Sequence, residues 1–271
     1  MQTPCRQGIP SHMDDLVDIG VNLAHRSFAA DLPAVLQRAR EAGVATLIIT
    51  GTSERTSEDA LTLARAHGVY STAGVHPHDA ARATPQTLHT LKTLLAEPQV
   101  VAVGECGLDF NRDFSPRDVQ EQVFEMQLEL ARQMGKPLFL HERDAHDRFM
   151  AVVRNHPGLA GVVHCFTGTA QEARVYVDAG FHLGITGWIC DERRGEALRS
   201  AVRHIPHERL LVETDAPFLI PRTIKPRPHR NEPAFLPHVV RALALCLGRA
   251  PEDVARVTTD NARRLFGLAH R

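Results

Sequence analysis

The chain has 271 residues, a hydrophobic share of 43% and a formal net charge of −1. This length suits one (β/α)₈ barrel of about 250 residues, and the composition is sufficient for a large core. The near-neutral charge excludes a basic nucleic-acid coat protein, although an enzyme with a local phosphate site remains compatible with it.

The first segment, residues 1–13, contains no apolar stretch of the kind that a signal peptide requires. We predict a flexible lead there and a single catalytic domain over residues 14–271, because no linker or low-complexity segment interrupts the remainder. No run approaches the roughly 18 apolar residues that indicate a membrane span. The five cysteines form no C-x-x-C pair, so we expect a reduced, cytoplasmic compartment.

Eight apolar runs follow one another along the chain, and each is typical of a buried parallel strand. They lie at residues 16–23, 44–51, 69–76, 100–109, 137–143, 161–168, 181–188 and 209–217. Amphipathic helical patterns separate them, and Ser115 before Pro116 is expected to cap the helix that follows the fourth run. The eight alternating units predict an α/β TIM barrel rather than an open sheet, and no G-x-G-x-x-G motif is present.

Side chains of a metal-binding type stand at the exits of four of these strands. They are Glu105 in VVAVGECGLD, His141 in PLFLHERDAH, His164 in GVVHCFTG and Asp215 in RLLVETDAP. The carboxyl ends of barrel strands converge on one face, so these groups can share one site. Imidazoles with carboxylates suit Mn²⁺, Zn²⁺ or Fe²⁺. Such an ion lowers the pKa of water and stabilises charge on an attacked phosphoryl or acyl group.

Each of these residues also has a plainer explanation when it is considered alone. A histidine at a strand end is more often a hydrogen-bonded residue than a ligand, and Asp215 before Ala-Pro could initiate a turn. Glu105 follows an apolar run, where an unpaired charge is costly. Coincidence is less probable for all four together than for any one, so we predict a shared metal site. Cys106 and Cys165 should point away from it by strand alternation.

A set of longer strings extends from about residue 16 to 267: DIGVNL, ITGT, STAGVHPHDA, VGECGLDF, HCFTGT, GITGW, CDERRG, ETDAP and RNEPA. They resemble the TatD family of metal-dependent deoxyribonucleases. The resemblance implies a TIM barrel of the metal-dependent hydrolase (amidohydrolase-like) type and a nuclease activity that needs a divalent metal. It further implies that Glu105, His141 and His164 are metal ligands. Asp215 would be a second-metal ligand or the base that orients the water.

The first strand departs from the pattern of many relatives, which carry D-x-H-x-H there. Gly20 and Asn22 occupy the two histidine positions in this chain. Glycine cannot ligate a metal, and an asparagine carbonyl is a weak donor. We therefore predict one firm metal site at Glu105, His141 and His164, and a second, weaker and more open position beside Asp215. Glu142 is a smaller oddity, and by alternation it should point away from the metal.

The expected substrate-binding residues lie at or after strand ends on the same face. One imidazole could hydrogen-bond a phosphate, the arginines could contact phosphates, and the only tryptophan could stack a base. Solvated loops and a structural tryptophan at the barrel rim are the alternatives. These predicted residues are His76, Arg143, Trp188, Arg222 and Arg230.

The leading functional prediction is a metal-dependent 3′-to-5′ exonuclease acting on single-stranded DNA, with RNA as an alternative, in DNA repair or degradation. Mg²⁺ is the expected ion, with Mn²⁺ or Zn²⁺ as alternatives. Glu105 and Asp215 are the expected catalytic carboxylates, with Asp215 as the base for in-line attack by water. A deacylase of D-aminoacyl-tRNA would share the ligands, whereas a non-catalytic binding protein would not need them. Neither a membrane nor an obligate protein partner is expected.

Overall fold

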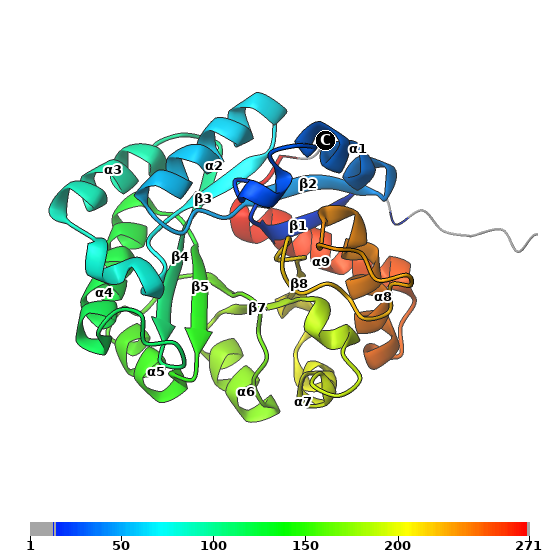
Figure 1. The fold of residues 1–271 in the computed structure, drawn as a ribbon. Helices are drawn as coiled ribbons and strands as arrows, with labels where there is room; N and C mark the ends of the chain where they lie inside the picture. The colour runs from blue at the N-terminus through cyan, green and yellow to red at the C-terminus, as the bar shows by residue number, and fades with distance from the viewer. Residues whose placement is uncertain (1–12, 14, 270–271) are drawn as a thin grey trace, which may run out of the picture.

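The computed structural model describes Met13 and residues 15–269. Its strands are β1 (Leu16–Val21), β2 (Val44–Ile49), β3 (Tyr70–Ala73), β4 (Val100–Asp109), β5 (Leu138–Arg143), β6 (Gly161–Val163), β7 (His182–Ile185) and β8 (Leu210–Val212). Within that range, the eight strands pair in parallel in chain order, which confirms the predicted TIM barrel (Figure 1). The predicted lead lies outside the described residues except for Met13, whose side chain is buried.

Helices surround the strands (Figure 1). They are α1 (Leu32–Glu41), α2 (Glu54–His67), α3 (Pro85–Leu95), α4 (Arg117–Met134), α5 (His146–Arg154), α6 (Ala170–Asp178), α7 (Glu196–Ala201), α8 (Leu236–Leu247) and α9 (Pro251–Phe266). Short 3₁₀ segments are η1 (Arg26–Phe28), η2 (Pro77–Arg82), η3 (Gly187–Cys190), η4 (Val202–His204), η5 (His207–Arg209) and η6 (Pro233–Phe235). In the part of the chain that the structure describes, no helix combines the length and apolarity needed to cross a membrane.

Local sequence signals begin and end several helices. Ser53 and Thr84 precede α2 and α3, and each accepts a backbone N–H from the first turn in a capping box. Gly68 and Gly135 end α2 and α4 in the left-handed conformation, which only glycine adopts without steric cost. These signals fix where each helix leaves the strand that precedes it.

The expected serine cap of α4 is wrong. The helix begins at Arg117 after Pro116, and Ser115 makes no capping hydrogen bond to it. The Ser115 hydroxyl instead donates to the carbonyl of His78 at 2.9 Å and accepts the N–H of Ala81 at 3.0 Å. The serine therefore fastens η2 to the chain before α4, and η2 follows the exit of β3.

Apolar side chains pack on both faces of the strands, as the continuous apolar runs predict. The larger cluster joins the strands to the surrounding helices and includes the fully buried Phe124 and Phe149. A second cluster contains Ile19, Phe139 and Leu211, and Phe266 of α9 belongs to it. The polar strand exits are thus held by a core that immobilises each strand.

The first and last strands meet through a small number of backbone contacts. Among the described residues, an isolated parallel bridge joins Val21 to Ala216. The N–H of Asp215 donates to the carbonyl of Gly20 at 2.9 Å, and the N–H of Asn22 donates to Ala216 at 2.8 Å. The barrel is therefore nearly closed, and the exit of β8 lies directly beside the exit of β1.

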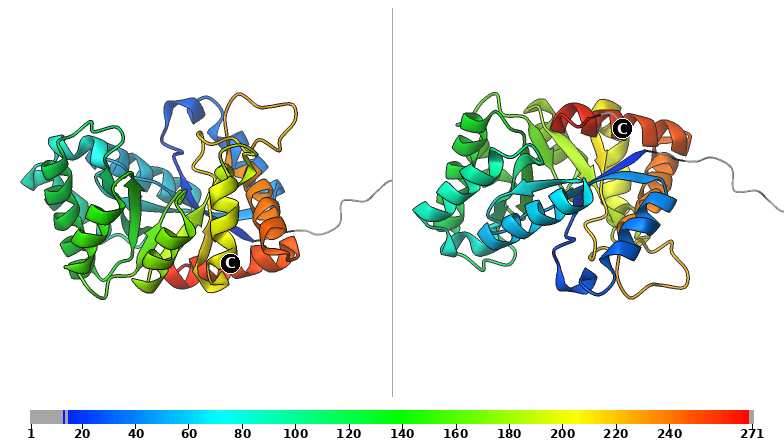
Figure 2. Two further views of the ribbon diagram at one scale, coloured as in Figure 1. Left: turned by 90° about the horizontal axis from the view of Figure 1, so that it is seen from below. Right: turned by 90° about the horizontal axis from the view of Figure 1, so that it is seen from above.

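The segment after β1 and the loop after β8 project side by side from one end of the barrel (Figure 2). Arg230 donates to both carboxylate oxygens of Asp31 at 2.7 and 2.6 Å, and its guanidinium lies over the ring of Phe28. Arg38 donates to Glu232 at 2.6 Å. These ion pairs tie the two segments together at the rim of the site.

Candidate metal centre

A single carboxylate oxygen lies at the centre of the polar cluster. Glu105, 6% exposed, places Oε1 at 2.9 Å from Nδ1 of His141 and 2.8 Å from Nε2 of His164. Nε2 of His76 lies 3.3 Å from the same oxygen. The side chains come from the exits of four successive strands, β3 to β6. The structure therefore brings the predicted ligands Glu105, His141 and His164 together and adds His76 to them.

The protonation of His76 follows from its backbone neighbour. The N–H of His78 donates to Nδ1 of His76 at 3.1 Å, so Nδ1 carries a lone pair and the ring proton lies on Nε2. Burial lowers the pKa of His76, which keeps the ring neutral. The Nε2–H group then faces Glu105 as a hydrogen-bond donor. This arrangement suits donation to an oxygen better than it suits ligation of a metal.

Asp109 belongs to the cluster, although the sequence analysis did not select it. Its Oδ2 lies 2.6 Å from Nε2 of His78 and 3.5 Å from Nε2 of His141, and its Oδ1 accepts the N–H of Arg112. Burial would raise the pKa of Asp109, but the nearby His141 ring, followed by the hydrogen bond from the N–H of Arg112, holds it below its usual value. Asp109 lies four residues after Glu105 on the same strand, and this even spacing could have indicated that both side chains are on one face.

Glu213 is a second carboxylate that the sequence analysis missed. It is fully buried, its Oε1 accepts the N–H of Cys165 at 2.6 Å, and its Oε2 lies 3.5 Å from Nδ1 of His164. A Cβ added at Gly20 would lie 2.4 Å from Oε2, and one at Gly184 would lie 2.6 Å from Oε1. The two glycines therefore leave room for this carboxylate, and Glu213 fills the space beside Gly20.

Asp215 lies on the β8 side of the site, next to β1. Nδ2 of Asn22 donates to its Oδ1 at 3.0 Å. Burial raises the pKa of Asp215 to about 7, and the negative charge of Glu105 acts in the same direction. Asn22, which stands where many relatives carry a histidine, thus positions the carboxylate of Asp215 by a hydrogen bond.

The backbone between Glu213 and Asp215 is held by a buried carboxylate. Asp18 of β1 accepts the N–H of Thr214 at 2.9 Å and its hydroxyl at 2.5 Å. On the other side, Asn231 donates to the carbonyl of Thr214 at 2.9 Å. Burial raises the pKa of Asp18 to about 7 against the hydrogen bonds of Thr214. We call this pair of residues, Asp18 and Thr214, the seam clamp.

The donor set fits a divalent cation. Among the described residues, Nε2 of His141, Nδ1 of His164 and Oε2 of Glu213 are buried without a hydrogen-bond partner. Ligand atoms of His76, Glu105 and His141 all lie within 4.8 Å of one another. Because Nε2 of His76 carries its proton and Nδ1 accepts the N–H of His78, Glu105 and His141 are the two ligands of this group. Imidazole nitrogens with carboxylate oxygens are a ligand set that Mn²⁺, Zn²⁺ and Fe²⁺ accept. A cation would provide the charge that these buried atoms lack.

Two of the predicted substrate contacts are engaged with carboxylates. Nε of Arg222 lies 2.8 Å from Oδ2 of Asp191, after η3. Arg230 is bound to Asp31, as described above. Both arginines therefore organise the rim, and a phosphate would have to share them with these partners.

The other predicted contacts are more available. The guanidinium of Arg143, at the end of β5, is exposed and makes no ion pair within the described part of the chain. Trp188 is half-buried in η3, and the guanidinium carbon of Arg194 lies 5.8 Å from its ring centre. Cys106 and Cys165, predicted to point away from the ligands, are free thiols, and burial raises the pKa of Cys165 to about 12.

A parallel barrel with buried imidazoles and carboxylates at its strand exits, in an arrangement that fits a divalent cation, defines the class of metal-dependent hydrolases. The chain matches the family described as TatD related DNase over residues 17–267 and belongs to it. The predicted family, fold and enzyme class, a hydrolase of phosphodiester bonds, are confirmed.

Similar proteins cover nearly the whole chain. The 3′-5′ ssDNA/RNA exonuclease TatD of Erwinia tasmaniensis is 52% identical over 259 residues, which cover 93% of this chain and 100% of the relative. The protein of the same name from Edwardsiella piscicida is 52% identical over 262 residues, covering 94% and 100%. The crystal structure of YJJV, a TatD homologue from Escherichia coli, superposes with a TM-score of 0.87 at 29% identity, covering 95% and 100%. A TatD family hydrolase from Entamoeba histolytica shares the fold, with a TM-score of 0.86 at 24% identity, covering 94% and 99%.

Proposed function

We propose that the protein is a divalent-metal-dependent 3′-to-5′ exonuclease acting on single-stranded DNA and RNA. The relatives that are 52% identical carry this activity in their names. The observation that carries the proposal is the group of three imidazoles around one carboxylate oxygen of Glu105. His141 and His164 lie 2.9 and 2.8 Å from it, and His76 lies 3.3 Å from it.

Glu105, His141 and His164 would hold the ion. Asp109, 3.5 Å from Nε2 of His141, would orient that imidazole. When bound, the ion would stabilise charge on the attacked phosphoryl group and ease the deprotonation of the attacking water. We propose Mg²⁺ as the working ion and Mn²⁺ or Zn²⁺ as ions that the imidazoles would hold more tightly.

Asp215 is the proposed base. Because Asn22 occupies Oδ1, the other carboxylate oxygen is left to accept a proton from the attacking water. Its placement is maintained by the seam clamp on the adjoining residue, Thr214. Nε2–H of His76 would donate to a phosphate oxygen, because its proton is fixed on that nitrogen by the N–H of His78.

The substrate strand would lie across the same barrel face. Arg143 is the proposed phosphate contact, and Trp188 is proposed to stack a base, worth roughly 1–3 kcal/mol. Arg222 and Arg230 contribute by holding the loops after β7 and β8 through Asp191 and Asp31.

The test uses 5′-labelled single-stranded DNA and RNA with purified protein in EDTA, Mg²⁺, Mn²⁺ or Zn²⁺, beside a Glu105→Ala variant. We expect a ladder of stepwise 3′ shortening that requires a divalent ion and disappears in the variant. Internal cleavage, or shortening that persists in the variant, would contradict the proposal.

A parallel arm supplies a D-aminoacyl-tRNA under the same conditions. We expect no metal-dependent release of the amino acid. Release of the amino acid without shortening of either nucleic acid would replace the exonuclease by the deacylase.

A further inference from the structure

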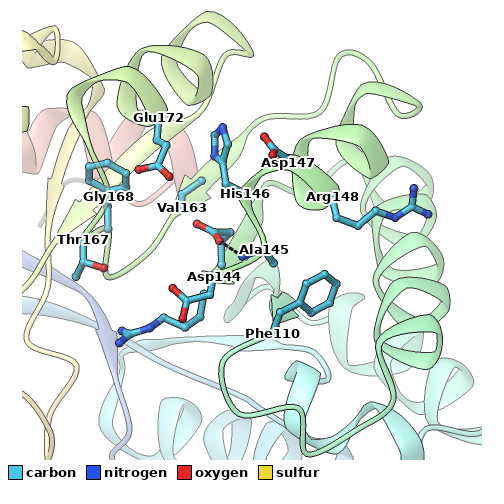
Figure 3. Close-up of a pocket in the computed structure, with 13 residues that line it drawn as sticks. Phe110, Asp144, Ala145, His146, Asp147, Arg148, Val163, Thr167, Gly168 and Glu172 are labelled. Carbon is cyan, nitrogen blue, oxygen red and sulfur yellow. Dashed lines mark hydrogen bonds between the residues drawn. The ribbon is translucent and has the colours of Figure 1, made fainter.

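An open pocket of about 590 Å³ is lined by residues from the exits of β5 and β6 and from helices α5 and α6 (Figure 3). Glu142 and Val163 line it, and each is the chain neighbour of a proposed ligand, His141 or His164. Successive residues of a strand point to opposite faces. The pocket and the metal centre therefore lie on opposite sides of β5 and β6, at the carboxyl ends of these two strands.

A hydrogen-bond relay selects the tautomer of an imidazole on the pocket wall. The Tyr176 hydroxyl, fully buried, donates to Oε2 of Glu142 at 2.9 Å. Since that hydroxyl proton is used, its oxygen accepts from Nδ1 of His146, which lies 2.8 Å away. Oε1 of Glu142 accepts the N–H of Ala145 at 2.8 Å, so both oxygens of this carboxylate are occupied. This relay places the proton of the His146 ring that faces Tyr176 on Nδ1, so in that tautomer the lone pair lies on Nε2.

The other polar groups of the pocket are mainly acceptors. Glu172 lies over Gly168 (Figure 3). Its Oε2 accepts the N–H of Thr169 at 2.6 Å, and its Oε1 remains as a hydrogen-bond acceptor for a ligand. Asp144 and Asp147 add two carboxylates. Arg148 is held by both oxygens of Glu121, outside the pocket, at 2.7 and 2.6 Å. A phosphate inside the pocket would be repelled by these carboxylates, so the pocket suits a neutral ligand with N–H donors better than a phosphate.

Two aromatic side chains and one arginine also line the pocket. Phe110 and Phe166 provide apolar surface, as sites for flat organic ligands do. Arg143 also lines the pocket, and it shares a strand face with His141, two residues before it. One uncommitted guanidinium thus stands between the metal centre and a pocket rich in acceptors.

We propose that this pocket binds a nucleobase of the substrate strand adjacent to the cleaved phosphodiester and prefers bases with an exocyclic amino group. The exocyclic amino groups of adenine, cytosine and guanine can donate to Glu172 and to Nε2 of His146, whereas thymine and uracil have no amino group and carry a carbonyl oxygen in place of the cytosine amino group, which these acceptors repel. Arg143 holds the phosphate of the same nucleotide. The inference rests on the proposed exonuclease function and gives it a base preference.

The test measures kcat/KM on 5′-labelled oligothymidylate carrying one variable nucleotide at the 3′ end or at the next position. The variable nucleotides are dC, dT and the 2-pyrimidinone analogue, which lacks only the amino group of cytosine. At one of the two positions we expect dC to be preferred roughly tenfold over both others, a discrimination within the range for a deleted hydrogen-bonding group.

Glu172→Gln is the diagnostic variant. It keeps an oxygen for the cap of α6 but replaces the remaining acceptor by an amide donor. We expect the dC preference to fall to about one, because the amide donor no longer accepts the amino group of cytosine and can donate to the carbonyl oxygen of thymine. Glu58→Gln, on the exposed face of α2, is the matched control and should keep the wild-type preference.

The results separate the two levels of proposal. Equal rates on dC, dT and the analogue at both positions, or a dC preference that survives in Glu172→Gln, would overturn the pocket while the exonuclease stands. Absence of 3′ shortening on every strand would overturn the exonuclease, and the pocket proposal with it.

Discussion

The two halves of the site are built from different donors. On the β3 to β6 side, imidazoles surround Glu105, and each has a partner that limits its orientation. On the β8 side, Asp215 and Glu213 are carboxylates beside Gly20 and Asn22, and the protein supplies amide hydrogen bonds rather than imidazoles. The first half fits a cation directly, whereas the second half is arranged to hold carboxylates in place.

This difference assigns separate tasks to one cluster. A nitrogen-rich half can hold an ion without its substrate, because the ligands are already gathered. In the carboxylate half, the negative charges can be balanced by a proton or a cation, or they can activate a water. This half lies next to the nearly closed seam of the barrel. Variants of Glu105 and Asp215 disturb one half at a time.

Glu105→Ala should have the largest effect, since it removes the oxygen that the imidazoles share. We expect kcat/KM to fall at least ~10³-fold, because ion-based stabilisation of the phosphoryl transition state is worth several kcal/mol. Mn²⁺ binding, followed by isothermal titration calorimetry on the folded variant, should be lost. Retention of tight Mn²⁺ binding would place the ion elsewhere.

Asp215→Asn should remove the proposed base but leave the nitrogen-rich half intact. We expect kcat to fall about 10²–10⁴-fold with Mn²⁺ affinity changed little, because general-base catalysis contributes on this scale. Kinetics and calorimetry on the same preparation provide the measurement. A parallel loss of Mn²⁺ affinity would show that the two halves bind the ion jointly.

Thr214→Val tests the seam clamp. The variant leaves a buried oxygen of Asp18 without its hydroxyl donor, so we expect roughly 1–3 kcal/mol of lost stability by denaturant titration. If the clamp positions Asp215, kcat should fall by about tenfold while KM changes little, a loss of ~1.4 kcal/mol in transition-state stabilisation. Thr214→Ser, which keeps the hydroxyl, should restore both values. A stability loss without any change in kcat would limit the clamp to a structural role.

His182, at the start of β7, should affect stability and not catalysis. Burial, followed by the charge of Arg209, lowers its pKa from 6.5 to about 4. Between these values the unfolded chain binds a proton that the folded chain refuses, so stability is complete above about pH 6.5 and falls as the pH drops toward 4. The contribution is roughly 1–3 kcal/mol. Urea titrations across this range should show a flatter dependence for His182→Gln, and an identical slope would contradict the assignment.

The sequence predicted the barrel and the nitrogen-rich half because both follow from period-two strand patterns. A polar residue directly after a buried run has to be compensated, and parallel strands bring such residues to one face. Glu105, His141 and His164 met both conditions. Their convergence required no knowledge of distances.

The carboxylate half was harder to predict. Glu213 in this half, like Asp109 on β4 in the other half, follows apolar residues as well, but glutamate and aspartate near strand ends are common in turns and caps. What distinguishes Glu213 is the room beside Gly20 and Gly184, and that room depends on how β1, β7 and β8 pack. Likewise, the pairing of Arg222 with Asp191 depends on loop conformations that strand periodicity does not determine.

The most direct test of the unequal halves is anomalous scattering from crystals soaked in Mn²⁺ at concentrations near the affinity of the first ion. We predict one strong peak among Glu105, His141 and His164, with a weak peak or none beside Asp215. Two peaks of full occupancy, one in each half, would contradict it.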